Sequence, residues 1–142
     1  MKNFRLIIAI LMLVPFFACN PQQSNKQAES FDNNSDKIEA YYFHFTARCM
    51  TCNTIEARTV ENLKTLYPGQ IEQGLISFQS VNLEEEVNKP LADRLGVSGQ
   101  ALLIVKGDKK INLTNEGFLY AVAKPEKFRE IINENVDGLL AQ

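Results

Sequence analysis

Hydrophobic and polar positions alternate along the middle of the chain in patterns typical of strands and helices. Residues 38–45 are rich in β-forming residues and apolar on both alternations, which predicts a strand covered on both faces. From Cys52 the apolar positions recur at helical spacing until Pro68-Gly69, which predicts an amphipathic helix. Residues 75–83 alternate again and predict a second strand.

The second half of the chain continues this succession. Residues 90–95 predict a short helix that stops at Gly96, and residues 101–105 predict a third strand. Gly107-Asp108 then forms a turn into residues 110–113, which we expect to be an antiparallel partner of the third strand.

A last helix is predicted to begin at Pro125. Its expected apolar face consists of Phe128, Ile131, Ile132, Val136 and Leu139. The segment 114–124 is longer than a link between the hairpin and this helix needs, so we expect a small insertion or an extra helical turn there. The whole order predicts an α/β domain with a parallel strand–helix–strand unit and an antiparallel edge.

The first residues resemble an export signal. Lys2 and Arg5 precede an apolar stretch, residues 6–18, that is too short to span a bilayer as a helix and suits a signal peptide. Ala18-Cys19 resembles the lipobox of bacterial lipoproteins, in which the cysteine is lipidated and becomes the first residue. The alternatives are a conventional signal peptide with an incidental cysteine, or a buried N-terminal helix.

These observations predict three segments. Residues 1–18 form a lipoprotein signal peptide, residues 19–36 form a flexible tether that is polar and poor in apolar residues, and residues 37–142 form one domain. We expect the mature protein on the periplasmic side of a bacterial cell envelope, as a monomer held at the membrane by a lipid on Cys19.

Composition excludes several function classes. The formal net charge is −2 and the chain has no extended basic run, so we expect no nucleic-acid partner. The single histidine argues against a multi-histidine metal site, and we expect neither a metal nor a cofactor.

The chain has three cysteines. Lipidation of Cys19 leaves Cys49 and Cys52 to pair with each other.

The C-x-x-C pair Cys49–Cys52 carries the expected chemistry. At the start of a helix, the first sulfur lies beside unpaired backbone N–H groups and the positive end of the helix dipole, which stabilise a thiolate. Cys49 is therefore the expected nucleophile, Cys52 the resolving thiol, and Arg48 a possible further stabiliser of the thiolate. His44 is either a proton carrier for this pair or a structural histidine at the edge of the core.

Two other interpretations of the pair are less favoured. A structural zinc site needs two more ligands, and His44 is the one other candidate within residues 37–142. A static disulfide is compatible with export, but it would close a very small loop and constrain the unfolded chain little. The placement between a strand and a helix favours redox activity.

The order of elements and the dithiol resemble the thioredoxin superfamily. More closely, residues 42–52, residues 99–105 and Pro125-Glu126-Lys127 resemble small bacterial thioredoxin-like proteins known as ArsF-type subunits of a nitrophenyl-compound nitroreductase. The resemblance implies a thioredoxin-like three-layer fold, a central mixed sheet of about four strands flanked by helices. It also implies a redox role, although the sequence has no flavin-binding signature.

The chain departs from thioredoxin at two places. Phe43 stands where thioredoxins have a buried acid that assists the second cysteine. Ala101, after Gln100, stands at the position of the cis-proline opposite the dithiol, so the expected substrate loop at Gln100 and Ala101 differs in shape. Because a cis bond before a residue other than proline costs about 2.5–4 kcal/mol, we expect Ala101 to be trans.

The sequence thus predicts an exported thiol–disulfide oxidoreductase whose partners are protein thiols, protein disulfides or a redox protein. Two alternatives remain open. The dithiol of Cys49 and Cys52 is a binding site for a soft metal or metalloid, or the protein is a non-catalytic accessory subunit of a redox enzyme.

Overall fold

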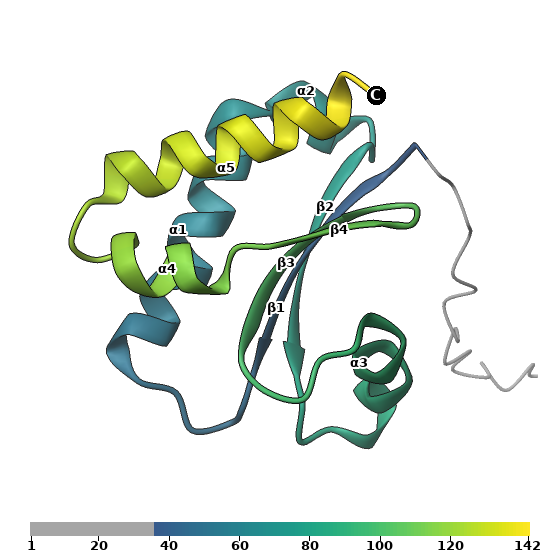
Figure 1. Cartoon of the computed structure of the whole chain (residues 1–142), viewed down its shortest axis with the longest axis vertical. Helices are drawn as coiled ribbons and strands as arrows, with labels where there is room; N and C mark the ends of the chain where they lie inside the picture. The colour runs from purple at the N-terminus through teal and green to yellow at the C-terminus, as the bar shows by residue number, and fades with distance from the viewer. Residues whose placement is uncertain (1–35) are drawn as a thin grey trace, which may run out of the picture. The chain divides into compact units, whose positions relative to one another are not determined.

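The computed structural model describes residues 36–142 (Figure 1). The expected signal peptide, the expected lipidation site Cys19 and the expected tether up to residue 35 lie outside the described residues. The elements follow one another as β1 (Ile38–His44), α1 (Met50–Leu66), α2 (Pro68–Glu72), β2 (Ile76–Asn82), the 3₁₀ helix η1 (Glu86–Asn88), α3 (Lys89–Leu95), β3 (Ala101–Lys106), β4 (Lys109–Asn112), α4 (Thr114–Tyr120) and α5 (Pro125–Leu140).

The sheet has four strands in the order β2-β1-β3-β4. β1 pairs with β2 in parallel, and the connection between them runs through α1 as parallel pairing requires. β1 pairs with β3 in antiparallel orientation, and β3 continues through a tight turn into its antiparallel partner β4. The mixed sheet expected from the sequence is therefore present.

Helices cover both faces of this sheet and give three layers. Figure 1 shows α1, α4 and α5 on one side and α3 on the other. The side chains of β1 alternate between the two faces of the sheet. Ala40 and Tyr42 pack with α1 and α5 on one face. Tyr41 and Phe43 pack with α3 on the other. The fold is thus the thioredoxin-like α/β sandwich that the order of elements indicated, with β1 covered on both faces.

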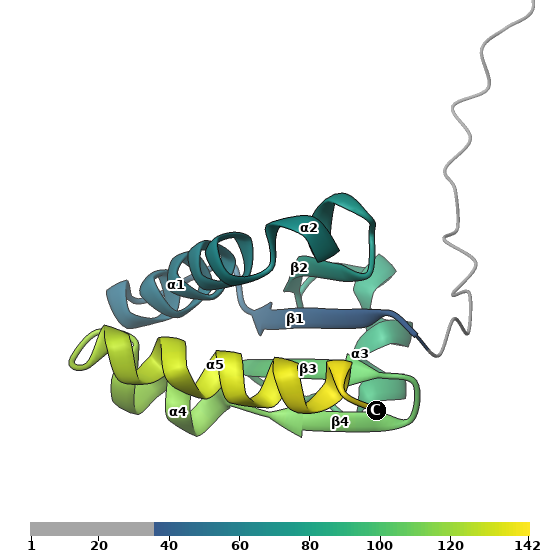
Figure 2. The same cartoon turned by 90° about the horizontal axis from the view of Figure 1, so that it is seen from above.

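The long helices α1 and α5 run side by side (Figure 2). Phe128, Ile132 and Val136 of α5 are fully buried, as its helical periodicity predicted. At the end of α1 the hydroxyl of Tyr67 donates a hydrogen bond of 2.8 Å to Asp137 Oδ1. This contact fixes the C-terminal end of α1 against α5.

Two short helices go beyond the sequence-based expectation. Pro68 ends the α1 pattern as expected, but it then opens α2, because its fixed φ suits the first turn of a helix. Within the segment 114–124 the extra helical turn is realised as α4. Its start is bound by Asn112, whose Oδ1 accepts hydrogen bonds from the backbone N–H and the hydroxyl of Thr114.

α4 packs against α1 through a glycine. A Cβ placed on Gly117 would lie 3.1 Å from Cγ2 of Ile55, which is itself fully buried. Gly117 therefore permits the close approach of α4 to the N-terminal half of α1, the half that begins with the two cysteines. Among the helices that the structure describes, none is both long and apolar enough to span a membrane.

We expect Gly117→Leu to lower the free energy of unfolding by about 1–3 kcal/mol, because the new side chain must displace Ile55 in a packed interface. Gly138 on α5 is the matched control, since a Cβ added there would have nothing within 4 Å. Gly138→Leu should be neutral or stabilising by up to ~1 kcal/mol through helix propensity. Urea unfolding followed by circular dichroism measures both, and equal effects of the two variants would contradict the close packing of α4.

Candidate active site

The two cysteines lie where β1 ends and α1 begins. Cys49 is the N-cap of α1, with extended backbone angles of φ −77° and ψ 167°. Its Sγ accepts a hydrogen bond from the backbone N–H of Cys52 at 3.2 Å. No acidic residue occupies the first turn of α1. The positive end of the helix therefore faces the sulfur of Cys49 without a carboxylate to neutralise it.

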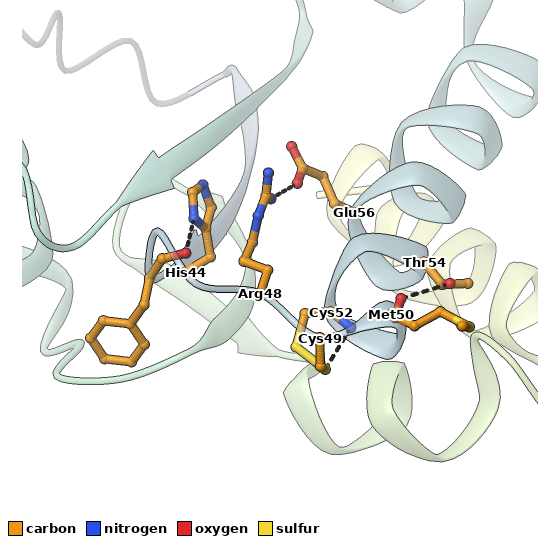
Figure 3. The surroundings of a disulfide bond; sticks show 8 residues. His44, Arg48, Cys49, Met50, Cys52, Thr54 and Glu56 are labelled. Atoms are coloured by element: carbon orange, nitrogen blue, oxygen red, sulfur yellow. Dashed lines mark hydrogen bonds and ion pairs between the residues drawn. A yellow bond between two sulfur atoms is a disulfide. The ribbon is translucent and has the colours of Figure 1, made fainter.

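Cys49 and Cys52 form a disulfide with a Cα–Cα distance of 5.2 Å (Figure 3). This distance lies within the range usual for unstrained cystines. The pairing inferred from the cysteine count is thus present in the structure.

The two cysteines differ in their exposure to solvent. Cys49 is exposed, whereas Cys52 is only 3% exposed. Met50, between them in the sequence, is 83% exposed. The arrangement therefore distinguishes an outer cysteine from an inner one.

Arg48 points away from the disulfide. Its Nη1 forms an ion pair with Oε2 of Glu56, on α1 (Figure 3). The guanidinium charge expected to assist Cys49 is therefore shared with a carboxylate that the sequence analysis did not single out. Glu56 follows Cys52 by four residues on one helix, a spacing that places them on the same face, and that was the available signal.

His44 is bound to the strands beneath the site. Its Nδ1 lies 2.9 Å from the carbonyl oxygen of Phe45, and its Nε2 lies 2.9 Å from Oγ of Ser80 on β2. The ring also stacks on Tyr42, with 6.1 Å between the ring centroids. Both ring nitrogens are thus engaged, one by the residue that follows β1 and the other by β2, which favours the structural role for this histidine over the proton carrier.

Phe43 does not lie beside Cys52. It packs with Leu91 and Leu95 of α3, on the face of the sheet opposite α1. Tyr42 is the β1 residue on the α1 side, because side chains of a strand alternate between faces, so an acid at position 43 would lie on the face of the sheet away from α1.

The expected substrate loop lies at the same end of the sheet. Ala101 pairs with Phe43, so the start of β3 and the end of β1 are adjacent, and the dithiol loop follows β1 directly. Residues 36–142 contain no cis peptide bond, which confirms that Ala101 is trans. Gln100 and Ala101 stay candidates for contact with a partner.

A second loop holds the residues that precede the dithiol. Glu84 Oε2 accepts a 2.7 Å hydrogen bond from the backbone N–H of Thr46. Asn82 Nδ2 donates to Oγ1 of the same threonine at 3.0 Å. In the sequence Glu84 is the first of three consecutive glutamates, and nothing local distinguishes it from its neighbours. The hydrogen bonds from Thr46 hold the pKa of Glu84 below its ordinary value.

This contact predicts a pH dependence. Since folding depresses the pKa of Glu84, its contribution to stability is present above the unfolded pKa, near about 4.3, and is lost as the pH falls through the folded value. We expect Glu84→Gln to lower the free energy of unfolding at pH ~7 and to lower it less at pH ~3, because the wild-type carboxylate gradually loses its charge as the pH falls through its folded-state pKa. Urea unfolding at both values measures this, and an equal loss at both would rule out the charge as the cause.

Comparison with known proteins does not assign a family. No protein-family model matches the chain, and no curated protein matches it. A solved structure described as the structure of a malarial protein aligns with a TM-score of 0.40 and 15% identity, over 62% of this chain and 96% of that one. A likeness of this degree indicates no shared function.

Proposed function

We propose that the protein is a membrane-anchored thiol–disulfide oxidoreductase in which Cys49 is the nucleophile and Cys52 the resolving thiol. The observation that carries the proposal is the contrast between the two sulfurs. Cys49 is exposed at the N-cap of α1, whereas Cys52 is buried behind it. A disulfide that only held the fold together would not need one of its sulfurs open to attack.

The start of α1 supports the nucleophile. In the reduced protein, the backbone N–H of Cys52 and the dipole of a 17-residue helix favour the thiolate of Cys49. Cys52 lacks this position at the cap, and its burial disfavours the charged form. In the reduced protein, Cys49 is therefore the thiolate and Cys52 the protonated thiol.

The reaction is a two-electron exchange. A thiolate of a partner dithiol attacks Sγ of Cys49, the Cys49–Cys52 bond breaks, and a mixed disulfide between partner and Cys49 forms with Cys52 as leaving group. The second partner thiol then attacks the mixed disulfide and releases Cys49. The partner ends as a disulfide, while Cys49 and Cys52 have gained two electrons; Cys52 takes up a proton. The reverse sequence reduces a partner disulfide.

The sequence supports the location and the kind of partner. The apolar segment 6–18 followed by Cys19 supports export and a lipid anchor at the cell envelope. The resemblance to ArsF-type thioredoxin-like subunits supports a redox protein as partner. The absence of a proline at Ala101 and the exposed Met50 give the surface around the disulfide a different form from that of thioredoxin itself.

We expect Cys52→Ser to accumulate mixed disulfides in cells that produce the full chain, because Cys49 forms the intermolecular bond and no resolving thiol remains. Acid quenching, alkylation and non-reducing electrophoresis detect the adducts. Cys49→Ser is the matched control: it keeps the buried thiol, and we expect at least ~10-fold fewer adducts, since Cys52 is inaccessible.

Two outcomes would contradict the proposal. Equal adducts in both variants would mean that exposure does not assign the roles. No adducts, combined with stoichiometric binding of copper(I) or a trivalent metalloid that Cys49→Ser abolishes, would make the dithiol a binding site instead.

A further inference from the structure

The charged side chains next to the dithiol form one ion pair that joins two parts of the site. Arg48 directly precedes Cys49 in the loop, and Glu56 lies on α1, four residues after Cys52. The two side chains are 27% and 22% exposed. The pair therefore connects the residue before the nucleophile to the helix that carries both cysteines, and it is partly shielded from water.

The pair lies near a buried hydroxyl. The ring of Tyr42 is buried on the α1 side of β1, and its hydroxyl has no hydrogen-bond partner in the described part of the chain. Burial raises the pKa of Tyr42, while the nearby Arg48 charge lowers it and the Glu56 charge raises it. The phenol thus experiences both charges.

In the oxidised site, Arg48 has one negatively charged neighbour among Glu56 and the two cysteines. Disulfide sulfurs carry no charge, so Glu56 is the anionic partner that the structure shows for Arg48. Reduction creates a second anion at Cys49, one residue from Arg48. The first turn of α1 holds no acidic residue that could also pair with Arg48. His44 is hydrogen-bonded to Ser80 and Phe45. Two anions then compete for one guanidinium.

We propose that Glu56 is a positioning residue that holds the Arg48 guanidinium away from Cys49 and thereby limits the positive charge available to the Cys49 thiolate. This inference rests on the proposed function, in which Cys49 is the nucleophile. Glu56 keeps the thiolate less stabilised than Arg48 alone would make it. A less stabilised thiolate is a stronger nucleophile and a less favourable leaving group.

A purely structural ion pair makes a different prediction. If the pair only anchored the loop, loss of either side chain would disturb the N-cap and shift the pKa of Cys49 in one direction. If Glu56 controls Arg48, loss of the two side chains has opposite effects. Removing Arg48 removes a cation and raises the pKa, whereas removing the charge of Glu56 frees the cation and lowers it.

The test is the pKa of Cys49 in the reduced full chain, read from the rate of iodoacetamide alkylation against pH with peptide-level mass spectrometry. We expect Glu56→Gln to lower this pKa and Arg48→Gln to raise it, each by roughly half a pH unit or more. In the Arg48→Gln background, Glu56→Gln should have less than about half of its single-variant effect, because its action depends on Arg48.

Glu61 offers a matched control on the same helix. Its carboxylate forms an ion pair of 2.8 Å with Arg58, and it lies farther along α1 from the cysteines than Glu56 does. We expect Glu61→Gln to leave the pKa of Cys49 unchanged. Arg48→Lys keeps the positive charge, so it should reverse most of the rise in this pKa that Arg48→Gln causes. Circular dichroism checks the folding of each variant.

Shifts of equal sign for Glu56→Gln and Arg48→Gln, or fully additive shifts in the double variant, would overturn the proposal. The measurement needs no partner protein. It therefore separates failure of this inference from failure of the proposed function, which the adducts of Cys52→Ser test on their own.

Discussion

β1 is the strand on which the other described elements depend. It is hydrogen-bonded to β2 on one side and to β3 on the other, and both of its faces are buried. An unpaired backbone group there would lose its hydrogen bond without gaining water, so both neighbours must be in place. The pairing of Phe43 with Ala101 at the end of β1 then brings the expected substrate loop to the edge where the dithiol begins.

The long, strongly patterned elements were predictable from the sequence, and so were the short helix α3 and the short strand β4, whereas α2 was not, and α4 was expected only as an insertion or an extra helical turn. The apolar periodicity of α1 and α5 and the apolar run of β3 reflect burial that is encoded in consecutive residues. α4 is seven residues long, and it depends on the cap from Asn112 and on the fit of Gly117 against Ile55. The fit of Gly117 against Ile55 joins segments distant in sequence, and such a contact leaves little local pattern.

The same distinction holds for the candidate site. Cys49 and Cys52 are recognisable because their spacing and their place before a helix carry chemical meaning within four residues. Glu56 and Glu84 are not, because their partners Arg48 and Thr46 lie in a loop whose path depends on the assembled sheet. The face of the sheet on which Phe43 lies was not predictable either, because β1 is apolar on both alternations and a shift of one residue in a strand reverses the side on which every side chain lies.

The small size of the ring closed by the disulfide has a thermodynamic consequence. The cysteines lie three positions apart, so the bond restricts the unfolded chain little. Folding and reduction form a closed cycle of four states. The difference in unfolding free energy between the oxidised and reduced protein must therefore equal the amount by which folding changes the reduction free energy of the dithiol. For a two-electron couple, about 1.4 kcal/mol in one quantity is ~30 mV in the other. The reduction potential of the dithiol therefore depends on how the folded site stabilises the reduced thiols, through the N-cap of α1 and the charges around it. A comparison of the unfolding free energies of the oxidised and reduced forms measures this effect of folding on the potential.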